Sequence, residues 1–255
     1  MADDSIAASA AVVIPLIWWG LNEQPQDIGH KPYGAPADWV APEKIQGRAA
    51  KNAINALKAG SKRKDFWLLF GSFFICGLST NGLIGTHFIP AAHDHGMGEV
   101  VAASLLAMIG VFDVVGTLFS GYLTDRIDSR KLLFAYYSLR GLSLMILPSI
   151  LFASVHPSTL VFVIFYGLDW VATVPPTIAL CRTVLGPKYG TVVYVWVFTG
   201  HQIGASVAAL GAAMLRVKLG DYALSFYIGG IMSILASFAV IFIARGKSFQ
   251  EIKHI

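Results

Sequence analysis

The sequence predicts an all-α integral membrane protein with six complete transmembrane helices and a partial one at the N-terminal end. Three observations predict this class. Of 255 residues, 55% are hydrophobic and only 13% are charged, about half of the charged share of soluble domains. Apolar runs long enough to cross about 30 Å of hydrocarbon occur six times. The connections between these runs alternate in their content of Lys and Arg.

The six runs are expected to be helices rather than strands of a membrane barrel. Each is continuously apolar over 24 to 26 residues, whereas barrel strands alternate in polarity over about 10 residues. Six such runs joined by short connections are also not a pattern of buried helices in soluble proteins. The runs cover residues 66–90, 99–123, 131–154, 158–181, 190–215 and 222–245.

A seventh apolar run, residues 6–20, is shorter and contains a proline. At 1.5 Å per residue it reaches about 22 Å, which is less than a full crossing. A cleaved signal peptide is disfavoured, because the flank before the run is acidic and a tryptophan pair stands where a small-residue cleavage site belongs. Residues 1–21 are therefore interpreted as the end of an earlier transmembrane helix.

The connections predict the orientation in the membrane. Residues 21–65, 124–131, 182–189 and 245–255 together hold 16 of the 19 Lys and Arg residues. Cytoplasmic connections carry such an excess of positive charge, so this side is expected to be cytoplasmic.

The domain organisation follows from this orientation. Residues 22–65 are expected to form a cytoplasmic linker, residues 66–245 the six-helix bundle and residues 246–255 a cytoplasmic tail. The first part of the linker is rich in Pro and Gly. Its second part, residues 43–60, places Ala, Ile and Leu on one helical face and basic residues largely off it. This pattern predicts either a basic amphipathic helix on the membrane surface or a solvated linker helix.

Composition and motifs exclude several classes of function. The sequence contains no nucleotide-binding loop, metal-binding helix or nucleophile elbow. The net charge of +4 comes without a basic face or a stacking motif, so nucleic acid is not an expected partner. Cys76 and Cys181 lie far apart in apolar runs and are predicted to be small packing residues. We therefore expect no catalytic residue, no metal and no cofactor, and the lipid bilayer as a partner.

Four ionisable residues interrupt the predicted spans. An ionisable group at the bilayer centre costs several kcal/mol on insertion scales, so it normally faces a cavity or a partner. Helical rise places Asp113, Arg140 and His201 about 15, 13 and 16 Å from the ends of their spans. Asp169 lies in the middle of its own span. All four are therefore expected at the midplane, on four different helices.

A ligand or proton site would explain this convergence. Arg140 suits a carboxylate, because its planar fork donates two parallel hydrogen bonds. Asp113 and Asp169 could carry protons. His201 could titrate near neutral pH or only donate a hydrogen bond. The alternative is a buried ion pair between Asp113 and Arg140 that only fixes how two helices pack.

Three further features lie around these residues. The stretch LSTNG at residues 78–82 predicts either an unwound substrate-binding segment that includes Asn81 or a glycine-weakened helix. Pro175 and Pro176 predict a kink inside a span, because each lacks an N–H group. Trp196 is expected either to line a cavity or to pack.

The stretch GYLTDRIDSRK at residues 121–131 resembles the signature loop of the major facilitator superfamily, G-x-L-a-D-r-x-G-r-k. Asp128 stands where this pattern has glycine. The loop joins the second and third complete spans, so its placement resembles the C-terminal half of a twelve-helix transporter. That half is a bundle of two inverted three-helix repeats. The matching residues are Gly121, Leu123, Asp125, Arg126, Arg130 and Lys131.

Other stretches resemble bacterial members near the oxalate/formate antiporter and monocarboxylate transporter branch: PQDIGHKPYGAP, GLDWVATVPPTIALC and FTGHQIGAS. The resemblance implies a secondary transporter of small organic anions such as carboxylates, coupled to protons or working by exchange. It implies alternating access in the bacterial inner (plasma) membrane. A sensor or scaffold with the transporter fold, and an intramembrane enzyme, are the alternatives.

The resemblance also implies a partner, because a single bundle has only half of a cavity wall. The partner would be a missing N-terminal six-helix half or a second copy of the chain, and a fragment is the favoured expectation.

The signature loop is expected to be mechanical rather than chemical. It lies in water about 15 Å from the midplane residues, where charge is not costly. Asp125 and Arg126 are expected to cap helix ends, to pair with neighbouring helices and so to stabilise one access state. The alternative is a loop whose basic residues only set the topology.

Overall fold

The computed structural model describes residues 2–21, 25–31 and 49–244. The chain divides into two units, Met1–Gly47 and Arg48–Ile255. The smaller unit holds α1 (Ala2–Gly20) and a short 3₁₀ helix, η1 (Pro25–Ile28). Residues 22–24 and 32–48 of the expected linker and the whole tail at 246–255 lie outside the described residues.

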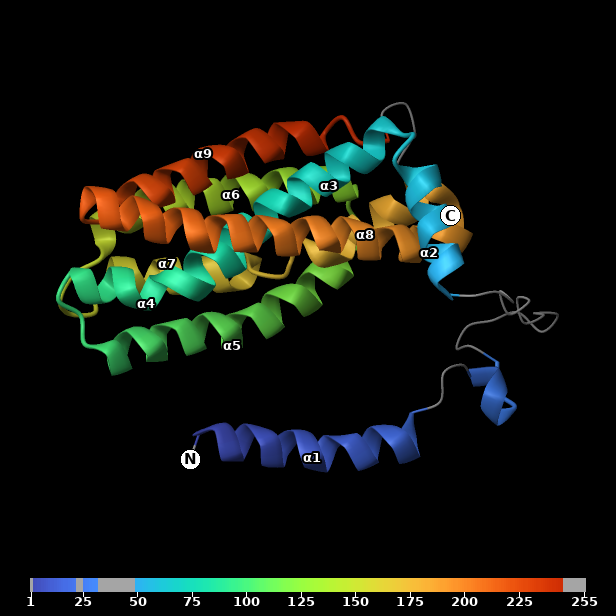
Figure 1. Ribbon diagram of the computed structural model, residues 1–255, viewed down its shortest axis with the longest axis horizontal. Helices are drawn as coiled ribbons and strands as arrows, with labels where there is room; N and C mark the ends of the chain where they lie inside the picture. Colours follow the sequence, from blue (N-terminus) through green and yellow to red (C-terminus); the bar gives the residue numbers. More distant parts are fainter. Residues whose placement is uncertain (1, 22–24, 32–48, 245–255) are drawn as a thin grey trace. The chain divides into compact units, whose positions relative to one another are not determined.

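The larger unit confirms the predicted fold class. Its described part is built from helices, and six helical stretches are long and apolar enough to cross a membrane (Figure 1). The elements are α2 (Ala49–Gly60), α3 (Lys64–Gly77), η2 (Leu78–Ile84), α4 (Gly85–Asp94), α5 (Glu99–Thr124), α6 (Ser129–Ile150), α7 (Pro157–Asp169), α8 (Val174–Leu219) and α9 (Ala223–Val240).

Two of the six spans are not single regular helices. The first span, Lys64–Asp94, runs through α3, η2 and α4, and η2 is a π-helix. The fourth span, Pro157–Gly186, is broken between α7 and the start of α8. Gly186 then interrupts α8 with a φ of 76°, and the fifth span begins at Tyr189. A left-handed φ of this kind is available to glycine at little cost.

The expected kink at the proline pair is corrected by the structure. Pro175 and Pro176 stand in the first turn of α8, and the break precedes them at residues 170–173. The N–H groups in the first turn of a helix have no intrahelical acceptor. Proline, which lacks an N–H group, is therefore tolerated there. The prolines therefore begin a helix instead of bending one.

Glycines let neighbouring helices approach closely, and two contacts illustrate this. A Cβ atom added at Gly204 of α8 would collide with the backbone carbonyl of Phe74 in α3. A Cβ atom at Gly116 of α5 would collide with the backbone carbonyl of Leu168 in α7. Small residues are typical of such contacts in membranes, where close packing replaces the hydrophobic effect as the force between helices.

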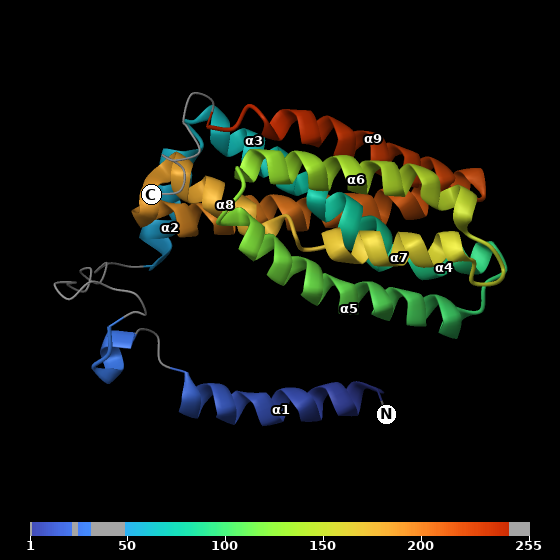
Figure 2. The same ribbon diagram turned by 180° about the vertical axis from the view of Figure 1, so that it is seen from behind.

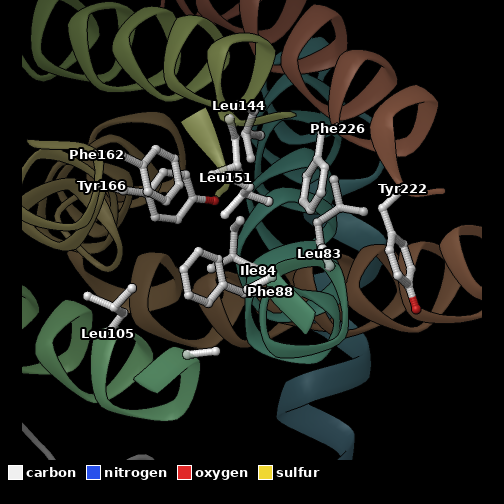
Figure 3. Packing of buried hydrophobic residues seen from close by; sticks show 14 of the residues in the cluster. Leu83, Ile84, Phe88, Leu105, Leu144, Leu151, Phe162, Tyr166, Tyr222 and Phe226 are labelled. Atoms are coloured by element: carbon white, nitrogen blue, oxygen red, sulfur yellow. The ribbon is translucent and has the colours of Figure 1, made fainter. Parts of the chain in front are cut away.

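The buried apolar residues form two clusters, one toward each end of the bundle. Figure 3 shows part of the first cluster, with Phe88, Phe162 and Phe226 brought together from three helices. The second cluster includes Phe66 and Val240. On several helices the two clusters are separated by a polar residue, so a polar layer crosses the middle of the bundle.

One edge of the bundle is formed by α5 (Figures 1 and 2). Only one stripe of this helix is buried, and it includes Leu105 and Ile109. The remaining surface is apolar, with Val111 and Leu118 more than half exposed. An apolar exposed surface of this kind suits contact with lipid.

The described part of the linker helix is α2, and it packs on the bundle. Ala56 is fully buried, and the indole Nε1 of Trp196 donates a hydrogen bond to the carbonyl of Ala53 at 2.9 Å. Residues 49–60 thus form a helix that contacts the bundle, and its place at the membrane surface or in solvent stays a prediction. Trp196 anchors this helix and does not line the midplane site.

Candidate functional site

Arg140 occupies the centre of the polar layer, with a side chain that is 0% exposed. Its Nε donates to Asp169 Oδ2 at 2.6 Å, and its Nη1 donates to Cys76 Sγ at 3.0 Å. Its Nη2 donates to the carbonyls of Asp169 at 2.6 Å and Trp170 at 3.1 Å. One bond from Nε, one from Nη1 and two from Nη2 engage four of the five N–H donors of the guanidinium.

This pairing corrects the alternative in which Arg140 pairs with Asp113. Asp113 Oδ1 instead accepts from the backbone N–H of Val171 at 2.9 Å and from the Thr117 hydroxyl at 3.1 Å. Asp169 is the ion-pair partner because α7 ends at this residue, which brings both its carboxylate and its carbonyl toward α6.

The break between α7 and α8 is held by side chains of two other helices. From α6, Arg140 satisfies the carbonyls of Asp169 and Trp170. From α5, Asp113 satisfies the Val171 N–H, and the Ser120 hydroxyl donates to the Ala172 carbonyl at 2.5 Å. An unsatisfied backbone group in hydrocarbon costs several kcal/mol, so an open break needs such partners.

One oxygen of the site has no partner. Asp169 Oδ1 is buried and makes no hydrogen bond among the described residues. A buried acceptor without a partner costs about 1–3 kcal/mol, and more when it is charged. This oxygen is therefore a position for a proton or for a hydrogen-bond donor of a ligand.

Cys76 packs in the second apolar cluster, as predicted, and it also belongs to the site. Its sulfur accepts from Arg140 and lies 3.3 Å from the Thr173 hydroxyl, at the N-cap of α8. The sequence contained a signal for this second role, because Cys76 lies two residues before the LSTNG stretch and thus close to the predicted midplane. Cys181 is a packing residue in the second apolar cluster.

His201 lies at the margin of the site. Its Nε2 is 3.5 Å from the Thr80 hydroxyl, and its ring also interacts with the Cys76 thiol. The ring stacks on Phe198, with 5.2 Å between centroids. The structure thus brings His201 to the Cys76 side of Arg140, in an aromatic environment.

The π-helix η2 passes beside the site. Its backbone is bonded by Tyr166 of α7, whose hydroxyl donates to the Ser79 carbonyl at 2.8 Å. The side chain of Asn81 is exposed, and only its carbonyl has a described bond, accepted from Thr86 at 2.8 Å. The predicted irregular segment thus lies near the site, but Asn81 does not enter the Arg140 cluster. Sequence reasoning missed Tyr166, although it stands three residues before Asp169 on the same helix face.

The signature loop is organised by Asp128. This residue caps α6 by accepting from the backbone N–H of Arg130 at 2.9 Å, and it also holds the Arg130 guanidinium. Arg130 in turn reaches the carbonyl of Ala244, beyond α9, at 3.5 Å. Burial alone would raise the pKa of Asp128, but the hydrogen bonds and charge of Arg130 outweigh burial and hold this pKa below its ordinary value.

The expected capping of a helix end is confirmed for Arg126, whereas the Asp125 side chain makes no capping bond among the described residues. Arg126 folds back on its own helix, where its guanidinium lies 3.6 Å from the Tyr122 ring centre and donates to the Tyr122 carbonyl at 3.1 Å. Asp125 is exposed at the C-terminal end of α5. The side-chain cap of α6 is Asp128, the residue that departs from the family pattern.

Six apolar spans around a buried ion pair define an integral, multi-pass membrane protein. The family model described as Major Facilitator Superfamily matches residues 5–209, and the chain belongs to this family. The membership confirms the resemblance of the GYLTDRIDSRK loop. It identifies the chain as part of a membrane transporter family.

The chain is also similar to curated transporters over part of its length. The chain is 28% identical over 185 residues to monocarboxylate transporter 12-B of Danio rerio, covering 71% of this chain and 38% of that protein. It is 28% identical over 177 residues to the uncharacterized MFS-type transporter YcxA of Bacillus subtilis, covering 67% and 38%. It is 28% identical over 167 residues to monocarboxylate transporter 13 of Rattus norvegicus, covering 61% and 38%. The matches therefore span about two fifths of each relative.

Proposed function

We propose that this chain is one six-helix half of a secondary transporter for small organic anions such as carboxylates. It works by alternating access, coupled to protons or by exchange. The observation that carries the proposal is the buried ion pair between Arg140 and Asp169 at a helix break. Two relatives named as monocarboxylate transporters support the substrate class.

The geometry suggests how an anion could be bound and released. While the pair is closed, Asp169 and two carbonyls occupy the donors of Arg140, so a carboxylate cannot take two parallel bonds. A proton accepted by Asp169 would remove its negative charge and weaken its hold on the guanidinium. A substrate carboxylate could then replace it, since guanidinium binds carboxylates in a planar, bidentate way. Binding of the anion and of the proton would thus favour each other.

The same arrangement assigns roles to the neighbouring residues. Asp113 and Ser120 would keep the break between α7 and α8 open while Arg140 changes partner. Cys76 of α3 and His201 of α8 would receive the guanidinium. The residues that contact the substrate would then be Arg140 and Asp169, while Asp113 would be a positioning residue.

We further propose that a second six-helix bundle completes the cavity, either from an N-terminal half or from a second copy. The membrane would be the bacterial inner membrane, with the linker and the C-terminal tail in the cytoplasm. The bias of Lys and Arg toward those segments supports this orientation. Sequencing of the genomic DNA upstream of Met1 tests the first possibility, because six further spans in frame would identify the missing half.

The substrate class is tested by counterflow in proteoliposomes with a panel of monocarboxylates and dicarboxylates, using the complete two-bundle protein. Arg140→Ala is expected to abolish exchange. Arg140→Lys keeps the charge but loses the bidentate fork, so it is expected to fold normally and to lose most of the exchange. Lys218→Ala, an exposed change of the same charge, is the control and should exchange as the unmodified protein does.

Unimpaired exchange by both Arg140 variants would exclude a role of this residue in anion binding. Binding of carboxylates without any exchange would instead indicate a sensor with the transporter fold.

A further inference from the structure

A cavity of about 260 Å³ lies between α5, α6 and α7. Its floor is buried and includes Arg140, Asp169 and Gly116. Its rim is exposed: Phe119, Leu139 and Phe165 have exposed fractions of 59%, 53% and 59%. We call this space the lateral cavity, because it opens on the flank of the bundle between α5 and α6.

Asp169 forms part of the floor of the lateral cavity and is 6% exposed. Its Oδ2 is held by Arg140, and its Oδ1 is buried and makes no hydrogen bond among the described residues. The polar groups that a ligand in the cavity can contact are therefore the hydroxyl groups of the half-buried Tyr136 and Ser143.

The charges of the site select a neutral ligand. Arg140 and Asp169 balance each other, and the remaining lining residues carry no formal charge. A charged ligand would place an uncompensated charge in an apolar environment, which is costly. Tyr136 and Ser143 add two hydroxyl groups to the wall, while the rim is aromatic and aliphatic. The lining thus fits a molecule with one small polar end and an apolar body.

The size of the cavity is sufficient for such a molecule. A cavity of about 150 Å³ lined by apolar side chains already accepts benzene. The lateral cavity is larger, and its exposed rim allows an apolar tail to extend outward between α5 and α6.

We propose that the lateral cavity binds a neutral amphiphile that carries a hydroxyl group, such as an alcohol or a phenol, taken up from the bilayer. The hydroxyl bonds to the hydroxyl groups of Tyr136 and Ser143, and the apolar part lies against Phe119, Leu139 and Phe165. This binding requires that the bundle is embedded in lipid, but it does not require transport activity.

The proposal is tested by photolabelling of the whole chain in phosphatidylcholine vesicles with a diazirine derivative of 1-octanol, followed by mapping of the label by mass spectrometry. We expect label on the rim residues of α5, α6 and α7. Excess 1-octanol should compete for the site, whereas octanesulfonate, which has the same tail and a charged end, should not.

Variants on one helix separate the cavity from the general surface. Leu139→Trp fills the rim and is expected to remove most of the label. Leu142→Trp is the matched control, because Leu142 is 51% exposed on the same helix but does not line the cavity. Ser143→Leu also narrows the cavity and should also lose the label. This variant replaces Leu139→Trp in the test if Leu139→Trp does not fold.

Three results would overturn the proposal. The first is labelling that is equal in Leu139→Trp and Leu142→Trp, which would indicate random contact with lipid. The second is equal competition by octanesulfonate. The third is an unlabelled cavity, which would mean that it holds only water or is covered by a second bundle.

Discussion

A buried arginine must satisfy both its charge and its N–H donors inside the protein, and this requirement organises the midplane. Arg140 is paired with Asp169 and also bonded to two backbone carbonyls. Breaking a buried pair by removing one partner typically costs about 3–5 kcal/mol, because the remaining charge is uncompensated. Loss of Arg140 therefore affects both the proposed anion site and the helix break. This is why the lysine variant is the more informative change.

Asp128 allows a stability prediction at a single residue outside the membrane. Asp128→Ala removes the N-cap of α6 and the anchor of Arg130, so we expect a loss of about 0.5–2 kcal/mol in the free energy of unfolding. Thermal unfolding in detergent measures this loss. Asp125→Ala removes an exposed carboxylate from the same loop and should stay within about 0.5 kcal/mol of the unmodified protein.

The pH dependence of this contribution follows from the lowered pKa of Asp128. A carboxyl whose folded-state pKa lies below its unfolded value stabilises the fold above the ordinary value of about 3.9. The stabilisation is lost as the pH falls through the lowered pKa. The difference in stability between the unmodified protein and Asp128→Ala should therefore be constant near neutral pH and shrink in acid. A difference that grows in acid would contradict this assignment.

At the scale of elements, irregular segments meet at one level of the bundle. The π-helix η2 and the break between α7 and α8 are joined by Tyr166, which bonds the Ser79 carbonyl. π-Helical turns and broken spans leave backbone groups that need other partners, and such segments are frequent at functional sites. The regular spans α5 and α6 provide those partners through Asp113 and Arg140.

The contact between α3 and α8 can be tested with two glycines of one helix. Gly204→Ala places a methyl group against the Phe74 carbonyl, so we expect a loss of about 1–3 kcal/mol from overpacking. Gly211→Ala is the matched control, because nothing lies within 4 Å of its added Cβ. The control should be neutral or stabilising, since alanine is favoured over glycine within helices. Equal unfolding temperatures for the two variants would argue against the close approach.

At the scale of the whole bundle, polar contacts join neighbouring helices at each of its two ends. At the end that holds the signature loop, Asp65 accepts from the N–H of Ala244 at 2.9 Å, which joins α3 to the turn after α9. At the opposite end, Arg216 of α8 binds Asp94 of α4 through two bonds at 2.7 and 3.0 Å. Contacts at both ends of a span can bias a rocking motion toward one access state, because they form or break as the ends move.

Asp125→Asn tests the proposed mechanical role of the signature loop. In the proposed two-bundle protein, the exposed carboxylate would interact with the second bundle, so its loss should shift the balance between inward-facing and outward-facing states. We expect a severalfold slower turnover in counterflow with little change in the apparent affinity for substrate. A weaker affinity at unchanged turnover would indicate that Asp125 contributes to substrate binding instead. If neither turnover nor affinity changes, the loop only sets the membrane topology.

The sequence by itself determined the fold class, the six spans and the family. Length and hydropathy suffice for these, because every backbone group in hydrocarbon must be bonded internally and only a few architectures allow this. The depth of Asp113, Arg140, Asp169 and His201 also follows from the sequence, since helical rise is fixed.

The partners of these residues were decided only by the tertiary structure. Depth along a helix does not give its rotation or its neighbours, so the sequence suggested Asp113 as the partner of Arg140, whereas the structure pairs Arg140 with Asp169. The break before Pro175, which is set by long-range bonds from α5 and α6, turned Asp169 toward the arginine. The same packing left Asp169 Oδ1 buried without a hydrogen bond among the described residues.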